Sequence, residues 1–280
     1  MFHFYLGTHM PNWLTFAPMP LFVSRRTLSK YRRRLPERVH VNGAPAPWGN
    51  DSGGFTELQM FGKWSISAED YVAEVQRYHD EIGGLALASP RDWMCEDMII
   101  KGGWFKGVYF VGTKLSVREH QENTVNDFLT LKSLAPHLPW MPVLQGWTLT
   151  DYLECMDLYA RAGVDLTREP IVGVGTVCRR QGTKEAEQIL AVLSSFGLNL
   201  HGFGFKKTGL INAAPSLVSA DSMAWSMAAR REGRHPDCER EQVKHKNCAN
   251  CFRYARDWYT DVARIVEKHH ARSRQLAFAA

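Results

Sequence analysis

Short apolar runs alternate along the chain with longer stretches in which apolar residues recur every three or four positions. The runs are typical of buried strands, and the longer stretches of amphipathic helices. Strands are therefore predicted at residues 2–7, 38–42, 85–88, 142–145, 171–177, 198–205 and 215–220, and helices at 67–82, 117–133, 150–162, 184–196, 223–231 and 252–270. Residues 20–28 lead into a basic segment that we expect to be helical from about Ser29.

Capping residues mark the ends of the clearest helix. Ser67 is a suitable N-cap, Asp70 stands three positions later, and Gly83-Gly84 follows the last periodic residue. Gly163 and Gly197 end two later helices in the same way. Strand and helix thus succeed each other roughly seven or eight times, which predicts a parallel sheet.

The length of the chain selects among parallel-sheet architectures. With 280 residues, an α/β TIM-like (β/α)8 barrel is the leading prediction, and an open doubly wound sheet is the alternative. We assign residues 1–232 to the barrel. Residues 233–280 hold an irregular Cys-rich stretch and a terminal helix, which we expect to form a zinc-binding segment packed on the barrel.

Composition adds modest constraints. Apolar residues make up 45% of the chain and charged residues 22%, as in folded globular proteins, and the net charge of +5 permits a polyanionic partner. Basic residues gather in three places: Arg25, Arg26, Lys30, Arg32, Arg33, Arg34 and Arg38; Arg179 and Arg180; and Arg230, Arg231 and Arg234. Such clusters either contact phosphates or form a solvated face, and residues 25–38 are the candidate phosphate-binding stretch.

Cysteine spacing indicates a metal site near the end of the sequence. Three of the six cysteines, Cys238, Cys248 and Cys251, crowd into this region, which suits a reducing compartment with one metal site better than a disulfide framework. A closed structural zinc site needs four nitrogen or sulfur ligands. His245 is the preferred fourth ligand of Zn2+; the rivals are His235, His269 and His270, and the alternative without metal is free thiols.

Acids, an amide and glycines follow the predicted strands, where a parallel barrel carries its chemistry. The most specific string is Asp51-Ser-Gly-Gly-Phe55, in which the glycines let the backbone approach a flat ligand and the acid can serve as a general base. Later strings carry Asp92, Gln145-Gly146, the glycines of 173–175 and 202–204, and Asp221. Each also has a structural explanation: a turn cap, a loop acid, a buried amide, or a helix N-cap.

In this order and spacing the strings resemble the tRNA-guanine transglycosylase superfamily, from about residue 2 to residue 270. Residues 92–96, 173–180 and 248–251 are closer to its DNA-modifying branch, the phage-type 7-deazaguanine DNA transglycosylases. Bacterial tRNA enzymes are longer and carry a tighter Cys-x-Cys-x-x-Cys cluster, whereas Cys238 stands ten residues before Cys248 here. This departure favours DNA over tRNA as the substrate.

The resemblance implies a double displacement at C1′ of a guanosine nucleotide, with a covalent Asp–glycosyl intermediate and net retention. Asp221 fits the nucleophile, and Asp51 the acid/base that protonates the leaving guanine and deprotonates the incoming base. Asp92 is expected to accept hydrogen bonds from the purine, and Phe55 or Met223 to stack on it. The implied substrate-binding residues are Ser52, Gly53, Phe55, Asp92, Gln145, Gly146, Gly175, Thr176 and Met223.

The implied partners are guanine-containing DNA with the target base flipped out, and a free 7-deazaguanine (preQ0-like) base. The sequence leaves open whether an accessory protein takes part. The N-terminal residues lack a basic region followed by an uninterrupted apolar core, and no membrane span is visible. We therefore expect a cytoplasmic protein, located in the host cytoplasm if it is phage-encoded.

Three other functions compete with this interpretation. A tRNA-guanine transglycosylase would perform the same chemistry on another polymer. A non-catalytic zinc-dependent nucleic-acid-binding protein would keep the Cys segment and the basic stretch but would not need Asp51 and Asp221 together. A barrel nucleosidase would need a water-activating group or an acid cluster for a divalent metal, and the sequence offers no clear candidate for either.

Overall fold

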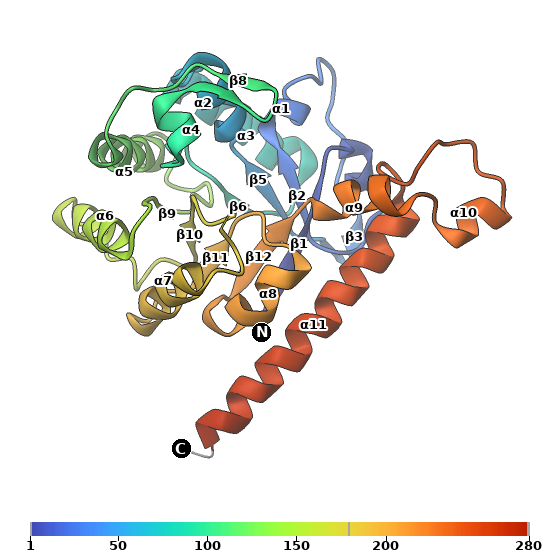
Figure 1. Ribbon diagram of the computed structural model, residues 1–280. Coiled ribbons are helices and arrows are strands. Elements are labelled where there is room, and N and C mark those ends of the chain that lie inside the picture. Colours follow the sequence, from blue (N-terminus) through green and yellow to red (C-terminus); the bar gives the residue numbers. More distant parts are fainter. Residues whose placement is uncertain (1, 179, 279–280) are drawn as a thin grey trace.

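A single curled sheet of eight parallel strands forms the centre of the computed structural model, which describes residues 2–178 and 180–278 (Figure 1). Its order is β6-β5-β2-β1-β12-β11-β10-β9. The strands are β1 (His3–Thr8), β2 (Leu21–Ser24), β5 (Trp48–Asp51), β6 (Leu85–Ala88), β9 (Val143–Leu144), β10 (Val172–Val174), β11 (Leu200–Gly202) and β12 (Ser219–Ser222). The first strand lies beside the last, so the sheet winds in one direction and is not doubly wound.

The two edge strands, β6 and β9, approach each other across the curl. One isolated parallel bridge joins Ala88 to Trp140, with the Ala88 N–H donating to the Pro139 carbonyl at 2.8 Å and the Met141 N–H donating to the Ala88 carbonyl at 3.0 Å. Among the described residues, ladder pairing stops there. The predicted α/β fold is confirmed as a curled parallel half-barrel, and the complete TIM-like ring stays a prediction.

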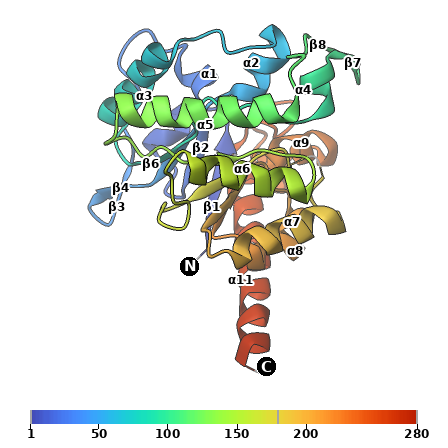
Figure 2. The same ribbon diagram turned by 90° about the vertical axis from the view of Figure 1, so that its left-hand side faces the viewer.

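Helices cover the outer face of the sheet (Figure 2). They are α3 (Ala68–Ile82), α5 (Val117–Leu134), α6 (Leu149–Arg161), α7 (Lys184–Ser195), α8 (Lys207–Ala213), α9 (Ala224–Glu232) and α11 (Phe252–Phe278). The predicted caps act as expected at α3, where the Ser67 hydroxyl accepts from the Asp70 N–H at 3.0 Å and Gly83 follows the last turn. None of the described helices is long and apolar enough to span a membrane.

Two strands of the main sheet, β2 and β5, were not predicted; residues 48–55 were expected to form a tight turn instead. Several short elements were not predicted either. They are the helices α1 (Arg25–Leu28), α2 (Gly54–Phe61), α4 (Asp97–Lys101) and α10 (Pro236–Arg240), the 3-10 turns η1 (Pro11–Thr15) and η2 (Ala214–Ser216), and two hairpins, β3 (His40–Val41) with β4 (Ala44–Pro45) and β7 (Gly103–Phe105) with β8 (Val108–Phe110). Asn42-Gly43 and Lys106-Gly107 turn the hairpins with positive φ at both residues. Asn-Gly is a strong hairpin signal that could have been recognised in the sequence.

Three sequence predictions are corrected by these elements. The basic helix expected from Ser29 is absent: helix α1 has ended by then, and residues 29–39 form no regular element. The strand expected at 38–42 belongs to the small outer hairpin instead of the main sheet. The strand expected at 215–220 begins only at Ser219, because η2 precedes it, so Asp221 lies inside a strand.

The basic stretch 25–38 is also not one phosphate-binding surface. Arg25 is buried and pairs with Glu57 and Glu74, and Arg26 also pairs with Glu57. Arg38 is buried as well. The exposed cations that remain are Lys30, Arg32, Arg33 and Arg34, which follow α1. Arg179, from the second basic cluster, lies outside the described residues.

Arg38 holds the N-terminal third of the fold together. Its guanidinium donates to the carbonyls of Leu14, Ala17, Met19 and Ala46, at distances between 2.7 and 3.0 Å. Burial lowers its pKa to about 10, which still leaves the side chain charged at neutral pH. One side chain thus donates to carbonyls of residues 14–19 and to the Ala46 carbonyl just before β5, and so connects these two segments.

Replacing this arginine tests that role. Arg38→Met removes the donor from the carbonyls of Ala17, Met19 and Ala46 and leaves the Leu14 carbonyl with the Val39 N–H alone, so we expect the free energy of unfolding to fall by at least about 3 kcal/mol, measured by urea denaturation. The matched control is Arg34→Met, an exposed position at which the loss stays within about 0.5 kcal/mol. Equal losses at the two positions would contradict the proposed role of Arg38.

Candidate active site and metal centre

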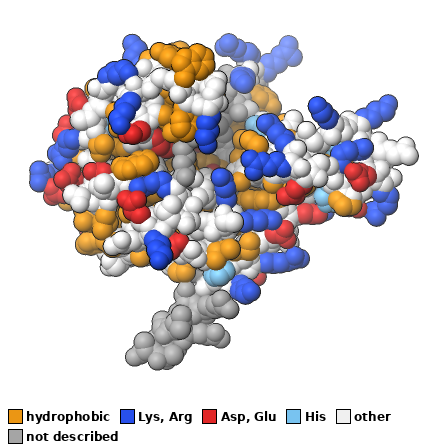
Figure 3. Space-filling view, in the orientation of Figure 1, with side chains coloured by type: hydrophobic (Ala, Val, Ile, Leu, Met, Phe, Trp, Pro, Cys, Tyr) orange, Lys and Arg blue, Asp and Glu red, His pale blue; other side chains and the backbone are white. Residues whose placement is uncertain are grey.

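A pocket of about 270 Å³ opens at the carboxyl ends of the strands. It is lined by Ser24, Asp51, Gly53, Phe55, Thr56, Ser89, Asp92, Met94, Glu96, Gly175, Thr176, Cys178 and Phe203. In the space-filling view, Lys and Arg side chains lie around the upper rim and across the middle of this side of the molecule (Figure 3). The described lining of the pocket itself carries three acids, Asp51, Asp92 and Glu96, and no lysine or arginine.

Asp92 is the centre of a buried hydrogen-bond chain. Its Oδ1 accepts from the Ser52 hydroxyl at 3.1 Å, and its Oδ2 accepts from Gln145 Nε2 at 2.7 Å. The Gln145 Oε1 in turn accepts from the Thr176 hydroxyl at 2.7 Å, and Thr176 Oγ1 accepts from the Cys95 N–H at 2.9 Å. This chain joins the segments that follow β5, β6, β9 and β10, which explains why distant strings of the sequence meet at one place.

Gly175 is required by the same network. A Cβ at this position would lie 2.3 Å from Gln145 Nε2, so any side chain would displace the amide that supports Asp92. Thr176 follows with φ of 59°, an uncommon conformation for a threonine, and its hydroxyl thereby reaches both Gln145 and Cys95. The glycine-rich string after β10 therefore shapes the wall of the pocket.

Asp51 is the last residue of β5, just before the start of helix α2. Gly53, with φ of +74°, makes the turn between them, and a Cβ there would lie 2.7 Å from the Arg26 side chain. Burial raises the pKa of Asp51, and the negative charge of Asp221 raises it further; hydrogen bonds from the Ser24 hydroxyl and the Gly53 N–H lower it. The net upward shift favours a protonated Asp51.

The pKa of Asp92, the second acid that lines the pocket, is also raised. Burial raises its pKa to about 7, and the charge of Asp51 contributes in the same direction, against the hydrogen bonds from Ser52 and Gln145. This carboxyl therefore changes protonation state near neutral pH. A ligand that donates two hydrogen bonds to it would stabilise the ionised form.

Asp221 lies on β12, beside β1, and is buried. Its Oδ1 accepts from the Gly204 N–H at 2.9 Å and lies 3.5 Å from His201 Nε2. The other ring nitrogen of His201 is hydrogen bonded to the Ser219 hydroxyl at 2.8 Å. The histidine, which the sequence analysis did not single out, therefore lies close to one oxygen of Asp221 from the interior of the sheet, without a hydrogen bond of good geometry to it.

The structure brings most of the predicted substrate-binding residues to one place. Asp51, Gly53, Phe55, Asp92, Gly175 and Thr176 line the pocket, and Ser52 and Gln145 support Asp92 from behind. Gly146 packs instead against helix α6, where a Cβ would lie 2.8 Å from that of Asp151. Met223 is half-exposed before α9 and is not among the described residues that line the pocket.

Other lining residues were missed by the sequence analysis: Ser24, Thr56, Ser89, Met94, Glu96, Cys178 and Phe203. Ser24 is the last residue of β2, a strand that the sequence analysis did not separate from the basic segment after it. The position of Phe203 depends on the sheet, since its ring lies against His201 at 5.0 Å between centroids. Only the arrangement of the strands brings these side chains together.

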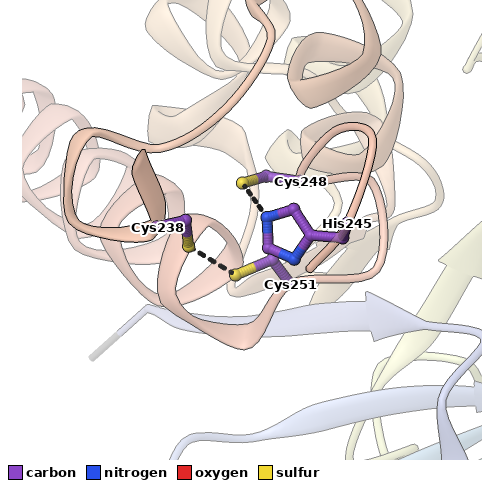
Figure 4. A group of neighbouring side chains, drawn as sticks. All are labelled: Cys238, His245, Cys248 and Cys251. Carbon is purple, nitrogen blue, oxygen red and sulfur yellow. Dashed lines mark hydrogen bonds between the residues drawn. The ribbon is translucent and has the colours of Figure 1, made fainter. Parts of the chain in front are cut away.

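The predicted metal ligands gather behind the start of helix α11 (Figure 4). Cys238 Sγ lies 3.6 Å from Cys251 Sγ, and Cys248 Sγ lies 3.3 Å from His245 Nε2. The four ligand atoms all lie within 4.8 Å of one another. Tetrahedral coordination with Zn–S bonds of about 2.3 Å separates the ligand atoms by about 3.8 Å, so the cluster fits such an ion.

His245 is therefore the histidine of this cluster. The rival His235 is occupied elsewhere: its Nε2 is hydrogen bonded to Asp257 at 2.9 Å, and its Nδ1 accepts from the Asp237 N–H at the start of α10. Its backbone N–H donates to Cys248 Sγ at 3.0 Å, an arrangement typical of metal-bound thiolates. His269 is not part of the described cluster, and the side chain of His270 lies outside the described residues.

The metal content of the purified protein provides a direct test of this Cys/His cluster. We expect the purified protein to carry close to one zinc per chain, measured by inductively coupled plasma mass spectrometry, and Cys248→Ser to lose it. The matched control is Cys178→Ser, a cysteine outside the cluster, which should keep the metal. A wild-type protein without any tightly bound metal would contradict the assignment.

One known protein family matches the chain over both the pocket and the Cys/His cluster. The family model of DeoxyPurine in DNA protein A (DpdA) matches residues 1–279, which include the pocket and the Cys/His cluster. No curated protein matches the chain significantly.

Proposed function

The chain belongs to the DeoxyPurine in DNA protein A family, and from this premise we propose that it replaces guanine in DNA with a 7-deazaguanine base by transglycosylation. Family membership gives it a role in deoxypurine modification, with DNA as the substrate. The observation that supports the base exchange is the pair of coupled acids, Asp51 and Asp221, beside a pocket backed by the hydrogen-bonded Asp92. The pKa of Asp51 is raised by burial and by the charge of Asp221, and Asp221 accepts a hydrogen bond from the Gly204 N–H with His201 close by.

In this proposal the purine binds against Asp92. Each carboxylate oxygen of Asp92 accepts one hydrogen bond from the protein and has a further lone pair available. The two oxygens can therefore accept from N1–H and from the exocyclic amine of guanine, a pattern that adenine lacks. Backbone groups of Gly175 and Thr176 serve the opposite side of the ring, and Phe55 is the preferred stacking partner because it lines the pocket.

The exchange takes place in two displacements. A carboxylate oxygen of Asp221 attacks C1′ of the deoxyribose, the bond from C1′ to N9 of guanine breaks, and Asp51 donates its proton to the leaving base. The ionised Asp51 then accepts the N9 proton of the incoming 7-deazaguanine, whose nitrogen attacks C1′ and releases Asp221. Two inversions leave the glycosidic bond in its original configuration.

The surroundings of the two acids fit these different roles. The upward pKa shift of Asp51 favours its protonated form, which can donate the proton that the leaving guanine needs. The Gly204 N–H donates to one oxygen of Asp221 and the His201 ring lies 3.5 Å from the same oxygen, which supports an orientation toward C1′ that does not depend on the substrate. We assign His201 as a positioning residue.

Zinc, held by Cys238, His245, Cys248 and Cys251, would have a structural role, because a set of four protein ligands leaves no position for substrate. The bound ion would tie α10 and the start of α11 together. We retain residues 233–280 as a zinc-binding segment attached to a catalytic unit of residues 1–232. We also infer that the Ala88–Trp140 bridge closes the sheet into a TIM-like ring, since Leu87 and Met141, one from each edge, share an interior apolar cluster.

Nucleoside mass spectrometry tests the reaction itself. Purified protein is incubated with guanine-containing DNA and, separately, with unmodified tRNA, each with a 7-deazaguanine base such as the 7-cyano form. We expect the deazaguanine deoxynucleoside to appear in DNA, and the rate to fall at least roughly a thousandfold in Asp221→Asn and Asp51→Asn. Asp165→Asn, an exposed aspartate, is the matched control.

Each outcome of this experiment bears on the proposal. Product in tRNA alone would overturn DNA as the polymer. Wild-type activity in Asp221→Asn would overturn the covalent intermediate. When the incoming base is omitted, a DNA adduct that survives denaturation and disappears in Asp221→Asn supports that intermediate.

The pKa of Asp92 predicts a pH dependence of base binding. Only the ionised carboxylate accepts both guanine hydrogen bonds, and its pKa of about 7 makes this form scarce in acid. Guanine should therefore bind about tenfold more weakly at pH 6 than at pH 8, measured by calorimetry. Asp92→Asn should bind weakly at both pH values. An unchanged affinity of the wild type across this range would remove Asp92 from base recognition.

A further inference from the structure

A second cavity of about 730 Å³ adjoins the base pocket. Glu96 and Cys178 contribute to the walls of both, so the two cavities are neighbours. One side is formed by the β7–β8 hairpin, through Phe105 and Lys106. The other side is formed by residues that follow β9, β10 and β11, among them Trp147, Arg180 and Lys206.

Arg180 is the unusual residue of this cavity. Its side chain is only 8% exposed, and its guanidinium carbon lies 4.5 Å from the centre of the Trp147 ring. None of its three nitrogens has a hydrogen-bond acceptor in good geometry among the described residues. Its one ion pair, at 3.3 Å, is with Glu185, whose side chain is 57% exposed.

Other buried arginines of the chain are differently arranged. Arg25 forms ion pairs with Glu57 and Glu74, and Arg38 donates to four carbonyls. Apart from the ion pair with Glu185, the donors of this buried guanidinium have no acceptor in good geometry, which is costly, so Arg180 is arranged for an acceptor that the described residues do not provide. A doubly charged or bidentate oxyanion matches that fork-shaped donor set best.

The charges around the cavity agree with an anionic ligand. Lys106 and Lys206 are exposed on opposite sides of it. Of the acids in its wall, Asp97 is paired with Lys101 at 2.8 Å and Glu185 with Arg180 itself. Glu96 lies at the boundary with the base pocket. Lys106 and Lys206 therefore leave positive charge available in the wall of this cavity.

We propose that this cavity is a nucleotide subsite in which Arg180 binds a backbone phosphate of the DNA strand next to the target guanosine. The inference rests on the proposed function, because a guanosine in the base pocket carries a phosphodiester on each side and one of them must leave through the adjoining space. Contact with the Trp147 ring holds the guanidinium of Arg180 in place, so its N–H donors bind the phosphate oxygens without a large loss of side-chain entropy. The subsite fixes the register of the strand and reads no sequence.

Phosphate neutralisation tests the subsite. Single methylphosphonate linkages are placed in turn at each position around the only guanine of a DNA oligonucleotide, and dissociation constants are measured by fluorescence anisotropy. For the wild-type protein we expect affinity to fall about tenfold at one linkage adjacent to the guanine. Arg180→Gln should bind unmodified DNA about tenfold more weakly and should be insensitive at that same linkage.

The controls separate binding from folding. Arg168→Gln removes an exposed arginine and should keep the wild-type profile, apart from a small uniform change. Arg180→Lys keeps the charge without the fork and should recover only part of the sensitivity. Thermal melting reports whether Arg180→Gln is folded, and the wild-type scan does not depend on any variant.

The outcomes distinguish this inference from the function on which it rests. A wild-type protein that exchanges guanine but shows a flat methylphosphonate scan would overturn the subsite alone. Equal sensitivity of wild type and Arg180→Gln at every linkage would assign Arg180 a purely structural role against Trp147. A wild-type protein that neither binds DNA nor exchanges guanine in it would overturn the proposed function and the subsite together.

Discussion

The candidate site depends on a carboxyl group that is buried without a cation. Asp92 has no arginine or lysine partner among the described residues; instead Ser52 and Gln145 donate to it, and Gln145 is held by Thr176. A buried acid is tolerable only if its oxygens are satisfied, so the ends of four strands must stay in register for the network to exist. The shape of the pocket and the preference for a donor-rich base both follow from that one requirement.

Much of this arrangement could be predicted from the sequence because the signals were local. Caps such as Ser67 and the alternation of strand and helix identified most of the outer helices and the parallel sheet. The strings around Asp51, Asp92 and Gln145 indicated the site, because the carboxyl ends of parallel strands meet at one face. Spacing identified the three cysteines of the metal cluster and favoured His245 among four candidate histidines, and the structure brings these four side chains together.

What could not be predicted was decided by contacts between distant residues. Within one basic stretch, Arg25 satisfies two acids, Arg38 satisfies four carbonyls, and Arg33 faces solvent, although sequence gives the three the same appearance. His201 gained its place beside Asp221 only through the pairing of β11 with β12. Met223 was itself predicted to stack on the purine, but it lies half-exposed at the turn into α9.

The position of β1 has a consequence for how the chain is made. This first strand lies between β2 and β12, and its Tyr5 is in register with Asp221, more than two hundred residues later. During synthesis the ribosome therefore releases a chain whose first strand keeps one edge unpaired until nearly the whole sequence has emerged. Such long-range pairing slows folding, and it makes the strand that carries Asp221 the last piece of the sheet to be added. Until that strand docks, a partly synthesised chain lacks this acid beside the pocket.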